Sequence, residues 1–156
     1  MGYMITAKCN NCKTSKDLLL GIGMLYDTDS IYFRNNGSML YEIVEDDRIV
    51  DEAMTLLNTE KGVPGEYNTD VYICPECKDI EQKFYFQIAE NESNGDNNIL
   101  YEPNYSCVKC KVPLKHIHFN WGEEAPDLEG KLKLEGWLCN ECGSSDMSCE
   151  ETGLWD

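Results

Sequence analysis

Eight cysteines of this chain form four pairs with one spacing, C-x-x-C: Cys9 and Cys12, Cys74 and Cys77, Cys107 and Cys110, Cys139 and Cys142. Two thiolates on such a tight turn can face one metal ion, and two turns complete a tetrahedral four-cysteine site. Redox-active dithiols and structural disulfides are the alternatives, although adjacent pairs differ from the spread cysteine framework of a secreted domain. The sequence therefore predicts two metal sites with eight cysteine ligands.

The intervals between the pairs bear on how the pairs combine. They are 61 residues at 13–73, 29 residues at 78–106 and 28 residues at 111–138. A cross-braced arrangement would bring the second and third pairs close in sequence, and chaperone-type repeats carry glycines after each pair; neither feature is present. We therefore predict sequential pairing, with the first two pairs in one site and the last two in the other.

The chemistry expected at these sites is structural. A four-cysteine zinc site is closed and leaves no position for water or substrate. A small ribbon also buries too little apolar surface to fold alone, and metal binding would supply the missing stability. The expected cofactor is Zn²⁺, two per chain, and we expect no enzymatic activity.

Elements that position the pairs can be read from the patterns around them. Ser38 can cap a short helix through Glu45, and Asp46 or Asp47 can cap a helix over 48–57, so a helical insertion is predicted at about 38–58. The segment 58–67 has the composition of a loop, and the alternation at 83–88 predicts a half-buried strand.

The predicted fold class is α+β, with two zinc-ribbon units of short antiparallel strands. The polar, turn-rich stretch at 91–98 contains the expected linker, at 93–98. The predicted domains are then a zinc ribbon at 1–92, which carries the helical insertion, and a second zinc ribbon at 99–156.

Charge limits the classes of partner. The chain has 13 Lys and Arg against 29 Asp and Glu, a formal charge of −16. Phosphate binding needs an excess of cations, so nucleic acid and anionic membranes are disfavoured as partners. Lys109, Lys111 and Lys115 form the one local group of basic residues that could favour nucleic acid. The longest apolar run, 18–26, is about half the length of a spanning helix, and the N-terminus has no secretory pattern. We expect a cytoplasmic protein and a protein partner with a basic surface.

Few other residues suggest chemistry. His116 and His118 have the spacing of one strand face, where a pH-sensitive role or a role beside the metal competes with ordinary packing. Cys149 is unpaired in the pattern and is expected to be a plain thiol, with a place in a metal site as the alternative. Phosphate-loop, serine-hydrolase, zinc-protease and EF-hand patterns do not occur in the sequence.

The segment Trp137-Leu138-Cys139-Asn140-Glu141-Cys142-Gly143 resembles the second knuckle of rubredoxins. That resemblance implies a single iron held by four cysteines and electron transfer as a rival function. The chain departs from the rubredoxin pattern at the third pair, where Lys111 follows Cys110 and the family favours glycine. A residue other than glycine makes the knuckle turn harder to form.

The whole chain more loosely resembles small bacterial tandem zinc-ribbon proteins of an uncharacterised family. The resemblance rests on the C-x-x-C pairs, the segment Leu20-Gly21-Ile22-Gly23-Met24-Leu25-Tyr26 and the ending Gly153-Leu154-Trp155-Asp156. It implies zinc binding in a bacterial cytosol. Together these features predict a zinc-dependent protein-binding or adaptor module. The alternatives are iron electron transfer, a nucleic-acid-associated ribbon and an acidic mimic of DNA.

Overall fold

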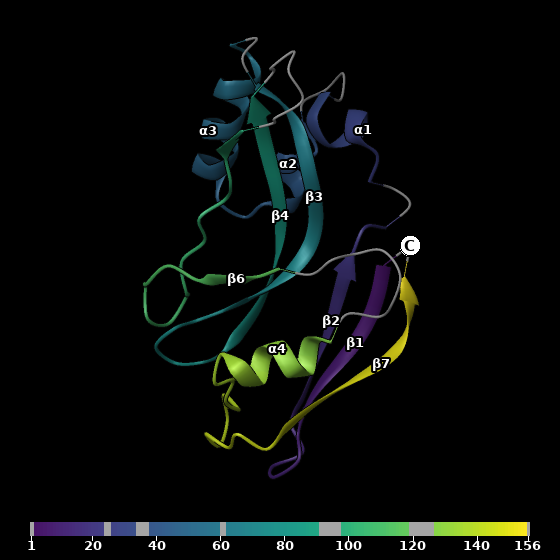
Figure 1. Ribbon diagram of the computed structural model, residues 1–156, viewed down its shortest axis with the longest axis vertical. Coiled ribbons are helices and arrows are strands. Elements are labelled where there is room, and N and C mark those ends of the chain that lie inside the picture. The colour runs from purple at the N-terminus through teal and green to yellow at the C-terminus, as the bar shows by residue number, and fades with distance from the viewer. Residues whose placement is uncertain are drawn as a thin grey trace. The chain divides into compact units, whose positions relative to one another are not determined.

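A computed structural model describes residues 2–23, 26–33, 38–59, 62–90, 98–118 and 127–155. Over these residues the chain is α+β, with seven strands in a mostly antiparallel sheet and four short helices, which confirms the α+β part of the prediction. The strand order is β5-β4-β3-β2-β1-β7, and β6 pairs with β3 (Figure 1). The strands are β1 (Gly2–Cys9), β2 (Ser15–Gly21), β3 (Gly62–Ile73), β4 (Ile80–Glu90), β5 (Ile99–Tyr101), β6 (Lys115–Ile117) and β7 (Met147–Trp155).

The described chain divides into two compact units, each discontinuous in sequence. Unit 1 comprises Met1–Gly23, Thr69–Lys83 and Tyr105–Asp156, and unit 2 comprises Met24–Asn68 and Phe84–Asn104. All eight paired cysteines belong to unit 1, so the arrangement as two separate ribbon units is not confirmed. The predicted linker at 93–98 lies outside the described residues except for Asn98, and a domain boundary there stays a prediction.

Unit 1 is built on three antiparallel strands in the order β2-β1-β7. β1 pairs with β2 on one side and with β7 on the other, so the two ends of the chain are neighbouring strands (Figure 1). Alternate residues of β1 (Ile5, Ala7 and Cys9) are buried, as the period of two of a half-buried strand requires. They join one core with Leu18, Leu20, Val71, Ile73, Ile80, Ile117, Leu128, Leu132, Trp137, Cys139 and Met147.

Unit 2 contains α1 (Thr28–Phe33), α2 (Leu40–Ile43) and α3 (Asp47–Leu57). The helix predicted over 48–57 is confirmed as α3: the Asp46 side chain accepts a hydrogen bond from the Arg48 N–H and caps it. Its apolar residues Ile49, Val50 and Ala53 are buried. The short helix predicted from Ser38 is confirmed in its centre, as α2. In this part of the chain Ile31, Tyr32, Leu40 and Val44 are buried, as are Phe86 and Ile88 of β4.

One segment differs from the prediction, and one helix was not predicted. The segment 58–67 was expected to be a loop, but from Gly62 it is part of β3 despite Pro64 and Gly65. Tertiary pairing therefore outweighs the local turn signal there. The approach to the last cysteine pair is helical, as α4 (Leu128–Leu134), which begins where Asp127 accepts a hydrogen bond from the Gly130 N–H. Within the described residues, none of the helices has the length and apolar character needed to cross a bilayer.

Candidate metal centres

The eight paired cysteines gather into two clusters of four, and their combination corrects the sequential prediction. We call Cys9, Cys12, Cys139 and Cys142 the outer site, and Cys74, Cys77, Cys107 and Cys110 the inner site. The first pair thus joins the fourth and the second joins the third. The predicted pairing of the first with the second and of the third with the fourth is wrong, although all eight predicted cysteines lie in a cluster.

Sulfur distances in both clusters fit a shared ion better than disulfides. The sulfurs of each site lie within 4.8 Å of one another. The Sγ–Sγ distances are 3.6 Å between Cys9 and Cys142, 3.5 Å between Cys12 and Cys139, and 3.8 Å between Cys77 and Cys107. Four zinc–sulfur bonds of about 2.3 Å in a tetrahedron place the sulfurs about 3.8 Å apart. A disulfide would need about 2.05 Å, and none of the nine cysteines forms one.

All four pairs adopt one backbone turn. In each, the N–H of the residue after the second cysteine donates to the carbonyl of the first cysteine; these donors are Lys13, Lys78, Lys111 and Gly143. The N–H of the first cysteine bonds the carbonyl five residues later, at Thr14, Asp79, Val112 and Ser144. In three of the pairs the N–H of the second cysteine also lies 3.5 Å from the sulfur of the first. These turns aim backbone N–H groups at thiolate sulfur, which favours the charged ligand.

The residue that closes each turn has a left-handed backbone. The φ angles are 67° at Lys13, 59° at Lys78, 60° at Lys111 and 70° at Gly143. The third knuckle therefore forms with lysine where rubredoxins favour glycine. A side chain in this conformation costs about 1–2 kcal/mol per residue, which glycine avoids. Three of the knuckles hold this strained conformation, which persists only where the surrounding structure over-determines the turn.

Replacing Lys111 with glycine is expected to stabilise the metal-loaded protein by roughly 0.5–1 kcal/mol, because the left-handed turn no longer carries a Cβ. Gly143→Lys is the opposite change and should destabilise by a similar amount, since the space around Gly143 is open and only φ opposes a side chain there. Urea denaturation of both variants measures the effects. Lys111→Gln removes the charge but keeps the strain and should change little; a gain in Lys111→Gln equal to that in Lys111→Gly would attribute the effect to charge.

Strand pairing explains why the pairs combine as they do. β1 leads into the first pair and β7 follows the fourth, and their antiparallel register sets Cys9 opposite Met147. In the same way β3 leads into the second pair and β6 follows the third, with Ile73 opposite Lys115. Each site thus forms at the end of an antiparallel pair, where one strand enters a knuckle and its neighbour leaves another.

Polar side chains tie the knuckles together. In the outer site, the Asn10 N–H donates to the Asp146 carbonyl at 2.8 Å, and the Asn10 side chain donates to the Asp146 carboxylate at 3.0 Å. Between the sites, Lys109 of the inner site donates to Asp79 at 2.9 Å and also to Asn140 of the outer site. Lys109 therefore bridges the two sites, and its pKa is raised by the hydrogen bond to Asp79.

The thiols differ in acidity and exposure. In each site the first cysteine of each pair is buried; Cys12 and Cys142 of the outer site are exposed, whereas Cys77 and Cys110 of the inner site are only partly so. Hydrogen bonding to Thr14 lowers the pKa of Cys12 to about 6, and hydrogen bonding with Cys77 raises the pKa of Cys110 to about 12. A metal must bind thiolates, so loading releases protons, and metal affinity falls as the pH falls.

The remaining candidates take no place in either cluster. His116 Nε2 lies 2.8 Å from Asp70, a carboxylate of which only 3 % of the side chain is exposed, and the His116 and His118 rings are 4.0 Å apart. The two histidines therefore share a face, as their spacing predicts. Cys149 lies in β7, outside both sites, so the alternative that it substitutes at the second site or joins a third site with the histidines has no support among the described residues.

Cys149 is expected to react slowly with alkylating reagents. Burial, with the nearby Glu129 carboxylate, raises its pKa to about 12, so little thiolate exists at pH 8. Iodoacetamide should label Cys149 of the native metal-loaded protein at least tenfold more slowly than it labels glutathione, as measured by peptide mass spectrometry. Labelling in denaturant after metal removal is the control and should be fast. Native labelling at the rate of glutathione would contradict the burial.

Sequence reasoning missed the residues that connect the knuckles. Three of these residues are short and polar and lie within a few positions of a cysteine pair: Asn10, Asp79 and Asp146. Such a composition is typical of turns, so the sequence does not indicate the hydrogen bonds that they form between knuckles. In the sequence Lys109 stands out only as one of three lysines near the third cysteine pair. The alternation of Met147 and Cys149 with polar neighbours could have indicated the strand β7, although not its pairing with β1. In searches against family models, curated proteins and solved structures, this chain matches none.

Proposed function

We propose that the protein is a zinc-binding module in which two structural Zn²⁺ ions hold unit 1 together and present it to a protein partner. The observation that carries the zinc assignment is the pair of four-sulfur clusters on four identical knuckles. Four thiolates and no other ligand fit a closed tetrahedral site. The same donor set also fits iron, which makes rubredoxin-like electron transfer the competing assignment.

Charge supports a structural rather than a nucleic-acid role. Two of the three lysines near the third knuckle are already paired with carboxylates: Lys109 with Asp79 at 2.9 Å and Lys115 with Glu135 at 2.5 Å. These ion pairs neutralise two of the three local positive charges, and the chain has a formal charge of −16. A zinc ion with four thiolates adds a further charge of about −2 at each site. The module is therefore proposed to meet a partner with a basic surface.

Elemental analysis of protein purified without added metal, with a visible spectrum, tests this assignment. Two zinc ions per chain and no colour are the expected result. Iron with thiolate charge-transfer bands would instead support electron transfer. Protein without metal and with four disulfides would overturn the proposal. For the partner class, failure to shift DNA or RNA at low salt is expected, and a shift that disappears steeply with salt would favour the nucleic-acid alternative.

A further inference from the structure

The C-terminal strand β7 is an edge strand of the sheet in unit 1. It pairs with β1 on one side, and none of the described strands pairs with its other side. An edge strand presents a row of N–H and C=O groups that can pair with another chain. Proteins also use this edge to bind extended peptides, in which main-chain hydrogen bonds give affinity and pockets for alternate side chains give specificity.

The first half of this edge is covered by the chain itself. The Met147 N–H donates to the Ser145 carbonyl at 3.0 Å, and the Cys149 N–H donates to the Glu129 carboxylate of α4 at 2.9 Å. Both groups therefore face away from β1. Because residues two apart in a strand direct their N–H groups the same way, Glu151 also faces outward. On this outer side none of the described strands lies beside Glu151, so among them the edge of β7 is unpaired from this residue on.

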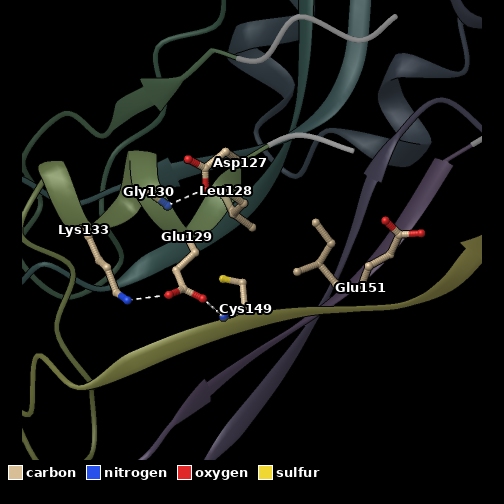
Figure 2. A pocket seen from close by; sticks show the side chains of 8 residues that line it. Asp127, Leu128, Glu129, Gly130, Lys133, Cys149 and Glu151 are labelled. Carbon is tan, nitrogen blue, oxygen red and sulfur yellow. Dashed lines mark hydrogen bonds and ion pairs between the residues drawn. The ribbon is translucent and has the colours of Figure 1, made fainter. Parts of the chain in front are cut away.

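A pocket of about 380 Å³ lies between α4 and the open part of the edge. Ile5 and Leu128 give it apolar walls, and Asp127, Glu129, Cys149 and Glu151 contribute its polar groups. Figure 2 shows Glu129 held between Lys133 and the Cys149 backbone, with Glu151 at the opposite end of the pocket from Lys133. The positive charge of Lys133 thus neutralises only that of Glu129. The side chains that line the pocket therefore have a net negative charge.

We propose that the β7 edge from Glu151 onward binds an extended basic segment of a partner protein, with a lysine or arginine side chain in the pocket beside α4. The apolar stem of that side chain contacts Ile5 and Leu128, and its cationic head reaches Glu151 and Asp127. Leu154, which is 57 % exposed, offers a further apolar contact along the edge. This inference rests on the proposed function, because it names the surface and the partner of that module.

Charge selects a basic partner over a second copy of the chain. An antiparallel pair of two β7 strands would bring Glu150 and Glu151 of one copy near the same residues of the other. Like charges opposite one another destabilise a strand pair, and charged edge residues are one way in which proteins prevent self-pairing. The same glutamates attract alternating lysines on an added strand, so they exclude the copy and favour the basic segment.

The test uses a fluorescent nine-residue peptide of alternating lysine and valine and the zinc-loaded full chain. Fluorescence anisotropy at low salt should give saturable binding that weakens as salt rises. Glu151→Lys should weaken binding at least tenfold, and Glu151→Gln should weaken it less. Glu66→Lys, at an exposed position of β3 in unit 2, is the matched control and should change affinity less than twofold.

Amide hydrogen exchange separates strand addition from simple charge attraction. Saturating peptide should slow exchange of the Glu151 N–H at least tenfold, because that group acquires an acceptor. Binding without this protection, binding insensitive to Glu151→Lys, or no binding at 1 mM peptide would each overturn the inference. So would a β7-mediated dimer in light scattering. Zinc content is measured on every sample first. Protein that holds two zinc ions but does not bind the peptide would refute this inference alone. Protein without zinc would refute the proposed function.

Discussion

The double substitution Cys9→Ser and Cys139→Ser is expected to leave one tightly bound metal ion per chain instead of two. Both residues belong to the outer site, so the inner site keeps all four of its thiolates. Replacing two of four thiolates removes the closed tetrahedral set, and the outer site should lose its metal. Elemental analysis after dialysis against a mild chelator gives the stoichiometry directly.

The matched control is Cys9→Ser with Cys74→Ser, which also removes two thiolates. These two residues come from different sites, so both sites are left with three thiolates and the metal content should fall from two towards zero. Sequential pairing of the knuckles makes the reverse prediction: the control would keep one ion and the first variant would lose both. An exchange of the two results would therefore falsify the nested arrangement.

Removing both metal ions is expected to unfold unit 1. Structural zinc sites contribute roughly 10–16 kcal/mol of apparent free energy each in zinc-finger-like peptides, whereas a whole domain is stable by only about 5–15 kcal/mol. Stripping the metal with a thiol-reactive mercurial and a chelator should abolish the amide protection of β1, β2 and β7. Hydrogen exchange with mass spectrometry measures that loss, and added thiol with zinc should restore the protection.

The helix α3 in unit 2 is the internal reference for this experiment. Ile49, Val50 and Ala53 are buried and contain no metal ligand, so amides of α3 should lose a smaller part of their protection than amides of β1. Protection of β1 and β7 that survives complete metal removal would show that the sites are not structural. Acid acts in the same direction, because protonation of the thiolates competes with metal, so the stability of unit 1 rises with pH until the ligands are ionised.

Local signals in the sequence were enough for the ligands and for several elements. The C-x-x-C spacing identified all eight clustered cysteines, because a knuckle is a local turn whose ligands are two residues apart. The helix α3 followed from a cap at Asp46 or Asp47 and from its apolar period, and β4 followed from the alternation at 83–88. Each of these features depends on fewer than a dozen neighbouring residues.

The pairing of the knuckles could not be obtained in this way. It depends on β1 meeting β7, whose partners Cys9 and Met147 are far apart in the sequence, and interval lengths carry no information on such a contact. The same is true of the start of β3, where Pro64 and Gly65 have the composition of a turn. Non-local strand pairing decides both, and a single sequence records it only weakly.

The nested order of the sites has a consequence for the growing chain during translation. The inner site has all its ligands once Cys110 has left the ribosome, whereas the outer site must wait for Cys142. Until then Cys9 and Cys12 have no partner pair, and β1 lacks its neighbour β7. Of the four knuckles, the first to be synthesised is therefore completed last, and its completion joins β1 to β7 after the inner site already has all its ligands.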